Sequence, residues 1–251
     1  MDRVHEQRRW LKSNFQDMLE VETDQHLKLP QPPLEKPYDV NGKIIDLPKV
    51  EIETLTNNSL LDILQNRESH RAYNMESLSL KELSFLLWAT QGVKDIKGNN
   101  YATLRPVPSA GARHPFETYI AVNRVEGLKS GIYRYIALSH KLILVEHKEN
   151  MEETLSELTL EQKFVGKSAV TFMWSVIPYR SEWRYNISAH KPMLLDAGHI
   201  CQNLYLACEA IGCGTCAIAS YNQEEIDRFL GIDGEDEFVV YVAPVGKVDK
   251  K

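Results

Sequence analysis

The sequence predicts an α+β fold, on three observations. Segments 117–124, 131–136 and 141–147 alternate apolar and polar residues and are joined by short turns containing Gly or Ser, which indicates antiparallel strands. Segment 169–177 is apolar and rich in strand-forming residues, so we expect a buried central strand. Helical periodicity occurs on both sides of these strands, but without the regular strand–helix alternation of a doubly wound fold.

The composition is that of an ordinary globular protein. The chain has 251 residues, 43% of them hydrophobic, which is enough for a substantial core. A net charge of −6 and a pI near 5.8 give no basic surplus for nucleic acid or an anionic membrane. No signal peptide or membrane span is expected, and four cysteines are ordinary intracellular usage. We therefore expect a cytoplasmic protein that holds any anionic ligand in a local cluster of donors.

The first fifty residues are expected to form a separate segment. Apolar residues in 3–20 recur at helical spacing. Prolines interrupt 28–50 and forbid a regular helix there. We interpret this stretch as an extended arm on the protein surface rather than a linker between domains. The predicted division is therefore 1–50, helix and arm, and 51–251, the main domain.

The main domain begins with two helices. A short one is expected from Asn58 to Asn66, and a second follows the S-x-x-E capping box of Ser79 and Glu82. Gly92 is a suitable residue for ending that second helix. Residues 93–103 are polar and are expected to be mobile.

The second half of the domain contains one long helix. It covers 191–211, is apolar around much of its circumference, and therefore belongs in a core or a subunit interface. Gly212 can end it. The remaining expected elements are a strand at 215–219, a helix at 223–230 and a strand at 237–246.

The first motif that could carry chemistry is Arg-Glu-Ser-His-Arg at 67–71. In an extended segment, Arg67, Ser69 and Arg71 point to the same side, so two guanidiniums and a hydroxyl converge. Arginine offers bidentate, charge-assisted donors, which suit a phosphate. A solvated charged loop is the alternative interpretation.

The second motif is the proline-bounded loop at 106–115. Ser109, Ala110 and Gly111 let a flat ligand approach the backbone, and the flanking prolines, including Pro108, stiffen the loop. A simple turn is the alternative. His114 could be a ligand or an acid, but a hydrogen-bonded loop histidine is the more common outcome.

Two further motifs are weaker. Cys213-x-x-Cys216 could be a redox dithiol or a metal site, but it follows a helix C-terminus, where the dipole disfavours a thiolate. We expect Cys201 and Cys208 to be small core residues. The segment 246–251 places Lys247 after a strand, where it could meet a phosphate or belong to a solvated tail. No dinucleotide fingerprint, P-loop or nucleophile elbow is present.

Taken together, these segments resemble the nitroreductase family, and within it the SagB/ThcOx-type dehydrogenases. The matching text is the 67–71 motif, LSLKELSFLLWATQGV, RPVPSAGARHPFETYIAV, GIYRY, LLDAGHICQNLYLACEAIGCGT and VVYVAPVGK. The resemblance covers roughly residues 55–247. It implies a mainly antiparallel sheet flanked by helices, an intertwined homodimer, and FMN bound at the subunit interface.

The resemblance also implies site residues. Arg67, Ser69 and Arg71 would bind the FMN phosphate and the pyrimidine side of the ring, and Lys247 would complete the phosphate site. The partner subunit would line the flavin with its own loop, and Gln91 would lie near the ring. The loop and reactive-face residues so implied are Pro108, Ser109, Ala110, Gly111, Gly214, Ala219 and Ser220. No metal ligand is implied.

The implied reaction is a ping-pong exchange in which NAD(P)H and a small acceptor, such as a nitroaromatic or quinone, use one cleft in turn. Azoline dehydrogenases of this branch carry a Lys-Tyr pair, which corresponds here to Arg184-Tyr185. Tyr185 could still act as an acid or base, whereas an arginine cannot replace the lysine in transferring a proton. An azoline dehydrogenase and a non-catalytic flavin-binding module are the alternative functions.

Overall fold

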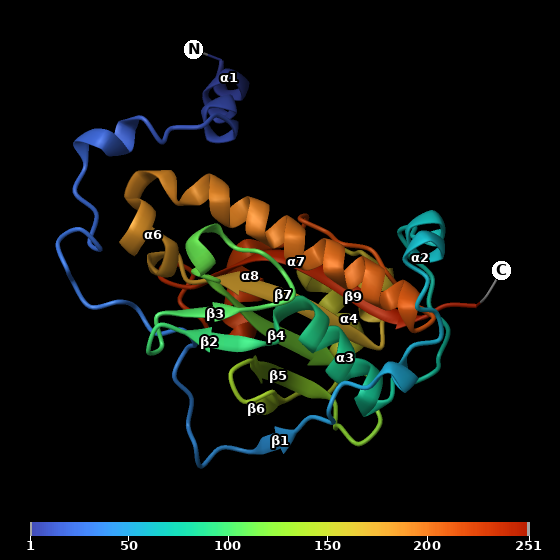
Figure 1. Ribbon diagram of the computed structural model, residues 1–251. Coiled ribbons are helices and arrows are strands. Elements are labelled where there is room, and N and C mark those ends of the chain that lie inside the picture. Colours follow the sequence, from blue (N-terminus) through green and yellow to red (C-terminus); the bar gives the residue numbers. More distant parts are fainter. Residues whose placement is uncertain (1, 250–251) are drawn as a thin grey trace.

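The computed structural model describes residues 2–249, and its centre is a seven-stranded sheet (Figure 1). The strand order is β1-β6-β5-β4-β7-β9-β8, and every neighbouring pair is antiparallel. The α+β prediction is confirmed. The strands are β1 (Ile44–Asp46), β4 (Phe116–Val122), β5 (Gly131–Ile136), β6 (Lys141–His147), β7 (Val170–Val176), β8 (Cys213–Thr215) and β9 (Phe238–Lys247).

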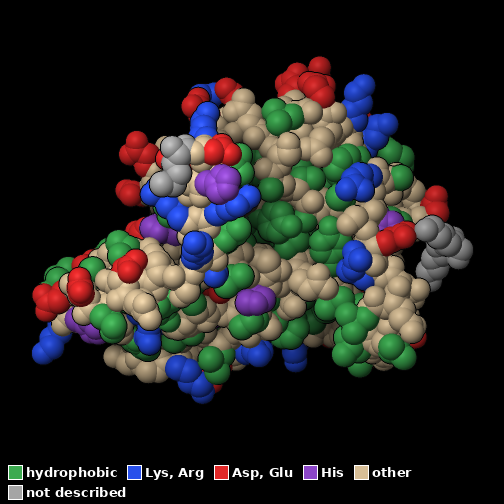
Figure 2. Space-filling model, turned by 90° about the horizontal axis from the view of Figure 1, so that it is seen from above, with side chains coloured by type: hydrophobic (Ala, Val, Ile, Leu, Met, Phe, Trp, Pro, Cys, Tyr) green, Lys and Arg blue, Asp and Glu red, His purple; other side chains and the backbone are tan. Residues whose placement is uncertain are grey.

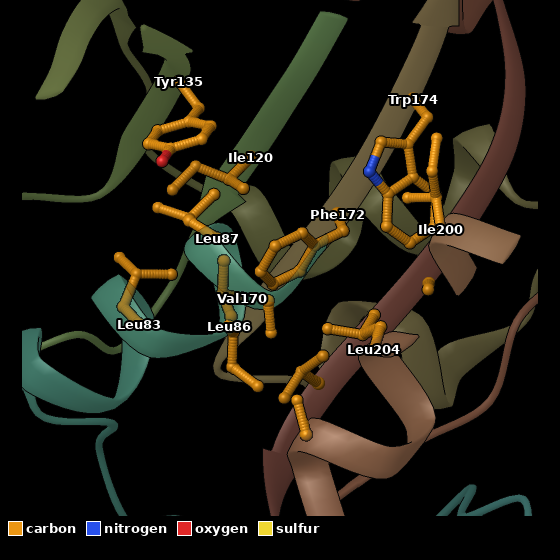
Figure 3. Close-up of a cluster of buried hydrophobic side chains, with 14 of the residues drawn as sticks. Leu83, Leu86, Leu87, Ile120, Tyr135, Val170, Phe172, Trp174, Ile200 and Leu204 are labelled. Carbon is orange, nitrogen blue, oxygen red and sulfur yellow. The ribbon is translucent and has the colours of Figure 1, made fainter. Parts of the chain in front are cut away.

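Helices cover both faces of the sheet, so the molecule has three layers. α3 (Leu80–Gln91) and α7 (His190–Ala210) pack on one face, as the cluster in Figure 3 shows. α4 (Met151–Leu158), α5 (Lys163–Gly166) and α8 (Gln223–Leu230) pack on the other. In β4, Ile120 faces the first layer and Ala121 the second, because successive strand residues alternate. This double burial explains the nearly continuous apolar runs of β4 and β7.

The long helix and the capping box occur where the sequence predicts them. Ser79 accepts from the backbone of Glu82, and Glu82 accepts in return. Gly212 follows the end of α7 with φ +67°, a left-handed conformation that favours glycine. Gly92 acts differently: its φ is −58°, but a Cβ there would lie 2.3 Å from Trp88. That glycine is required for space rather than for a turn.

The N-terminal segment is less helical than expected. The predicted helix over 3–20 is wrong: α1 (Arg3–Gln7) is followed by 3₁₀ turns at Arg8–Leu11 and Asp17–Glu20, with irregular chain between them. None of the residues in these elements is buried. An amphipathic pattern needs a surface to cover its apolar side, and this chain alone offers little there.

The proline-rich arm packs on the sheet and supplies β1, which pairs with β6. The Lys36 backbone N–H donates to Glu117 Oε1 at 2.8 Å, and the Lys36 ammonium pairs with Glu237. Arg134 in β5 donates to the carbonyl oxygens of Lys36 and Pro37. These contacts favour a packed arm over a linker.

Residues 93–103 form most of a hairpin, β2 (Asp95–Lys97) and β3 (Ala102–Leu104), rather than an irregular segment. Its turn runs through Gly98, Asn99 and Asn100, all with positive φ, which Gly and Asn adopt most readily.

The remaining helices are α2 (Leu60–Asn66) and α6 (Tyr179–Tyr185), which lie beyond opposite ends of α7 (Figure 1). The expected strand at 215–219 is shifted: β8 ends at Thr215, and only Ile218 forms a further bridge, to Val242. Lys250 and Lys251, at the end of the predicted domain and of the 246–251 segment, lie outside the described residues. Among residues 2–249, no helix is long and apolar enough to cross a membrane.

Candidate functional site

The Arg67–Arg71 segment is held against α7 and the chain after β8 by one tyrosine. Ser69 Oγ lies 3.1 Å from the hydroxyl of Tyr205, which also accepts the backbone N–H of Ala217 at 2.9 Å. The Arg67 guanidinium lies over the Tyr205 ring, 5.4 Å from its centroid. Tyr205 therefore fixes both the hydroxyl and the first guanidinium of the predicted phosphate site.

The same segment runs beside β8. The His70 N–H donates to the Thr215 carbonyl at 3.0 Å, and a Cβ on Gly214 would lie 2.6 Å from the His70 ring. Glycine at 214 thus permits this close approach.

The outer end of the cluster is formed by α5 and the chain that precedes it. The Arg71 guanidinium lies 6.0 Å from the ring centroid of Phe164. Gln162 donates to the Ser220 carbonyl at 2.9 Å, which holds the exposed residues Ala219 and Ser220 nearby. We call this assembly the Tyr205 cluster: Arg67, Ser69, Arg71, Tyr205, Gly214, Ala219 and Ser220.

The charge environment of the Tyr205 cluster is mixed. Burial raises the pKa of Glu209 and the charge of Glu68 raises it further, whereas the charges of His70 and Arg67 lower it. Lys247 pairs with Glu82 at the start of α3. Burial is the largest single influence and lowers the pKa of the Lys247 ammonium, but the hydrogen bond to Glu82 and the neighbouring negative charges together raise it above its ordinary value.

The proline-bounded loop is anchored on the other half of α7. Ser109 donates to Asp196 Oδ2 at 2.6 Å, and the Ala110 N–H donates to Oδ1 at 3.2 Å. Burial raises the pKa of Asp196, while these two bonds oppose the rise. The Ser109 oxygen also accepts the His114 N–H at 2.9 Å. One carboxylate thereby fixes the loop's conformation.

Tyr185 lies against this loop. Gly111 has φ +57°, and a Cβ there would lie 2.5 Å from the Tyr185 hydroxyl oxygen and 3.0 Å from Arg184 Nε. The structure therefore brings the predicted acid–base residue to the predicted ring platform. We call this assembly the Asp196 cluster: Pro108, Ser109, Ala110, Gly111, Tyr185 and Asp196.

The two clusters are separated along α7. Tyr205 comes nine positions after Asp196, or about 13 Å along a helix that rises 1.5 Å per residue. Gln91 belongs to neither cluster. It is buried, and its Oε1 accepts from Arg105 at 2.8 Å.

The cysteines are interior residues. All four are buried and free. Burial raises the pKa of Cys201 and of Cys213 to about 12. Among residues 2–249, no group of His, Cys, Asp or Glu is arranged to hold a metal ion. Cys201 and Cys208 are confirmed as core residues, and a protonated, buried Cys213 is poorly suited to thiolate chemistry.

An apolar area lies exposed on the outer face of α7. Leu194 and Leu195 are 58% and 56% exposed, respectively. Leu60, Leu61 and Leu64 of α2 are exposed as well. Figure 2 shows hydrophobic side chains gathered in a hollow at the middle of this face, with Lys and Arg on either side. Both clusters therefore adjoin an exposed apolar surface.

Comparison with known proteins identifies a family. The family model described as "Nitroreductase family" matches residues 64–247. The chain belongs to the nitroreductase family. It is 30% identical to the putative nitroreductase MJ1384 of Methanocaldococcus jannaschii over 202 residues, which are 80% of this chain and 98% of that protein.

The chain is also similar to two further proteins. The trifolitoxin-processing protein TfxB of Rhizobium leguminosarum is 29% identical over 143 residues, 54% of this chain and 38% of TfxB. A putative nitroreductase from Anabaena variabilis has a solved structure with TM-score 0.71 and 26% identity. The match covers 90% of this chain and 46% of that one.

Sequence patterns did not identify the two residues that organise the clusters in this member of the nitroreductase family. Asp196 and Tyr205 both lie in the long helix, whose sequence is largely apolar and therefore indicates a core element. The available signal was chemical: an aspartate and a tyrosine inside an otherwise apolar helix need hydrogen-bond partners.

Proposed function

We propose that the protein is an FMN-dependent oxidoreductase that transfers electrons from NAD(P)H to a small organic acceptor such as a nitroaromatic or a quinone. The observation that carries the proposal is the Tyr205 cluster. Two arginines and a hydroxyl lie beside a strand whose glycine permits close approach. Arginine donors suit a phosphate monoester, and the close approach permitted at Gly214 suits a ligand that also has a flat ring.

The proposed cofactor contacts within one chain come from the Tyr205 cluster. Arg67, Ser69 and Arg71 would bind the FMN phosphate and the pyrimidine side of the ring, and Ala219 and Ser220 would lie by its reactive face. When bound, FMN supplies the two-electron chemistry, while the protein supplies orientation and electrostatics. Lys247 would act on the phosphate only indirectly, because Glu82 already holds its ammonium.

We further propose that the working form is a homodimer. The Asp196 cluster lies too far along α7 to face the Tyr205 cluster of the same chain across one ring. A second copy related by a two-fold axis would bring its loop at 108–111 over the first copy's Tyr205 cluster. The exposed leucines of α7 and α2 support this, since such a dimer would cover them.

The first experiment is an absorption spectrum of the protein purified with added FMN, followed by anaerobic addition of NADH or NADPH. We expect a flavin band that bleaches with one donor and returns on addition of a quinone. A bound flavin that neither the nicotinamides nor any organic reductant bleaches would indicate the non-catalytic flavin module. Absence of flavin binding would contradict the proposal.

Arg67→Ala tests the phosphate assignment. We expect FMN affinity to fall roughly tenfold to a hundredfold, because one charge-assisted hydrogen bond contributes about 1.5–3 kcal/mol. Fluorescence titration of the apoprotein with FMN measures it. Arg228→Ala, an exposed arginine on α8, is the matched control and should leave FMN affinity unchanged. Equal affinities for wild type and Arg67→Ala would exclude this phosphate site.

An azoline dehydrogenase of a peptide-modification pathway is the second candidate. The match to TfxB and the position of Tyr185 beside the Asp196 cluster favour it. Arg184 opposes it, since a guanidinium stays protonated at neutral pH and therefore cannot exchange a proton with the substrate. Oxidation of a thiazoline-containing peptide, with bleaching of the flavin and no nicotinamide present, would select this function over the first.

A further inference from the structure

We propose that Arg184 and Arg113 form a receptor for a carboxylate on the electron acceptor. The inference rests on the proposed function and narrows its substrate class: the acceptor would be an aromatic or quinonoid acid rather than a neutral ring. Four features carry the inference, namely the contacts of Arg184, the burial of Arg113, the lack of a counter-ion and the position beside the ring platform.

Arg184 has hydrogen-bond donors that the described chain does not use. It lies in the last turn of α6, and its Nη1 donates to the Tyr101 hydroxyl oxygen at 2.9 Å. That oxygen also accepts from Gln25 Nε2 at 2.8 Å. Within residues 2–249, Arg184 Nε and Nη2 have no acceptor, although the side chain is only partly exposed.

Arg113 lies behind the same tyrosine. Its Nη2 donates to the Tyr101 carbonyl at 2.8 Å, and its Nε donates to the Gly111 carbonyl at 3.1 Å. The guanidinium lies 4.7 Å from the centroid of the Tyr101 ring. Arg113 is only 4% exposed, yet its contacts are with neutral groups.

The two cations have no counter-ion in the described chain. The ion-paired arginines of residues 2–249 are Arg180 and Arg228, so no carboxylate there neutralises Arg113 or Arg184. Burial lowers the pKa of Arg113, Tyr101 opposes this, and the charge of Arg184 lowers it further. Two neighbouring, partly desolvated cations are unfavourable by themselves, and an arriving anion would offset that cost.

The chemistry of the site favours a carboxylate on the acceptor. A guanidinium presents parallel donors that match a planar carboxylate. Arg184 packs on Gly111, the loop residue proposed to line the flavin, so the bound anion would lie close to the reacting ring. A carboxylate can be attached directly to an acceptor ring, whereas a ribose separates the phosphates of a nicotinamide donor from its reacting ring.

The test compares 4-nitrobenzoate with 4-nitrobenzamide, which have the same shape and differ in charge. For the FMN-loaded wild type we expect kcat/KM to favour the acid by roughly tenfold or more, as one charge-assisted hydrogen bond provides. Arg184→Gln should abolish this preference by slowing the acid only, and Arg184→Lys should restore part of it. Arg228→Gln removes an equal charge elsewhere and should change nothing.

A second measurement separates this inference from the proposed function. Calorimetric titration of the oxidised, FMN-loaded protein should show tighter binding of the acid than of the amide, and Arg184→Gln should equalise them. Reduction of both compounds at equal kcat/KM, with equal affinity, would overturn the receptor and leave the oxidoreductase intact. A loss in Arg184→Gln confined to kcat/KM for NADPH or NADH would also overturn it, assigning the cations to the donor's phosphates. Failure to reduce either compound, with the acid still bound preferentially, would overturn only the nitroaromatic activity.

Discussion

His114 is a residue whose environment decides its chemistry. It is 5% exposed, and burial, followed by the charge of Arg105, lowers its pKa to about 3. Two smaller effects act on the same pKa. A hydrogen bond to the Thr103 backbone raises it, and the charge of Arg113 lowers it. The imidazole is therefore neutral near pH 7 and cannot serve as a general acid there. The expectation of a hydrogen-bonded loop histidine is confirmed.

The same environment predicts a pH dependence of stability. The folded pKa of His114, about 3, lies below its ordinary value of 6.5, so protons bind more tightly to the unfolded chain. The contribution of His114 to stability is present above pH 6.5 and is lost as pH falls toward 3. We expect His114→Gln to flatten the fall in unfolding free energy across that window, measured by urea titration. The exposed His147→Gln should keep the wild-type slope, and an unchanged slope in His114→Gln would contradict the assignment.

At the scale of elements, β8 connects the core to the proposed phosphate site. Gly214 of β8 lies between the β9 strand and the His70 ring. The Arg67–Arg71 segment can take its position only because glycine has no side chain there. We expect Gly214→Ala to displace His70 and weaken FMN binding by roughly tenfold, the lower end of a charge-assisted bond. Equilibrium titration with FMN measures this.

A second substitution makes that prediction specific. His70→Gly removes both the ring and the Cβ that the new Cβ at 214 would meet, so the double variant Gly214→Ala with His70→Gly should bind FMN no worse than His70→Gly alone. Additive losses would show instead that Gly214 acts through some other contact. Wild-type affinity in Gly214→Ala would show that the segment adapts without cost.

Sequence patterns predicted the elements well where burial is strong. β5, β6, α3 and α8 occupy the residues expected, because each has a periodic apolar pattern and clear turn or cap residues. The pattern misled at 3–20, where apolar side chains such as Leu11 and Leu19 remain exposed in this chain. It also missed the hairpin at 95–104, whose strands are too short and polar to show alternation.

At the scale of the whole molecule, the exposed face of α7 predicts association. We expect the wild type to run as a dimer in analytical ultracentrifugation, because Leu194 and Leu195 would otherwise remain in water. Leu195→Glu places a charge in that interface and should give a monomer that binds FMN weakly. Leu160, 56% exposed like Leu195 but on the other side of the sheet, supplies the control Leu160→Glu. A wild type that is monomeric with FMN bound would contradict the dimer.

The candidate site was predictable as a set of residues but not as a geometry. Local spacing identified Arg67, Ser69, Arg71 and the loop at 108–111, because each motif is contiguous in sequence. It could not reveal that Asp196 and Tyr205 anchor them at separate points of one helix, since that depends on tertiary packing. The position of Gln91 could not be predicted for the same reason. Its burial beside Arg105 depends on how the helices pack on the sheet, which local sequence patterns do not reveal.

The separation of the two clusters along α7 has a genetic consequence. Suppose that each flavin is held by the Tyr205 cluster of one copy and the Asp196 cluster of the other. In a dimer of two different variants, the two substitutions are then not shared equally between the two sites. Arg67→Ala and Gly111→Val would each impair both sites of their own homodimer. In a heterodimer of the two, both lesions would fall on one site and leave the other wild-type. Each heterodimer would then have about half of the activity of the wild-type dimer. Because random assembly makes about half of the dimers heterodimers, co-expression of the two impaired alleles would restore about a quarter of the wild-type activity, which is complementation between alleles of one gene.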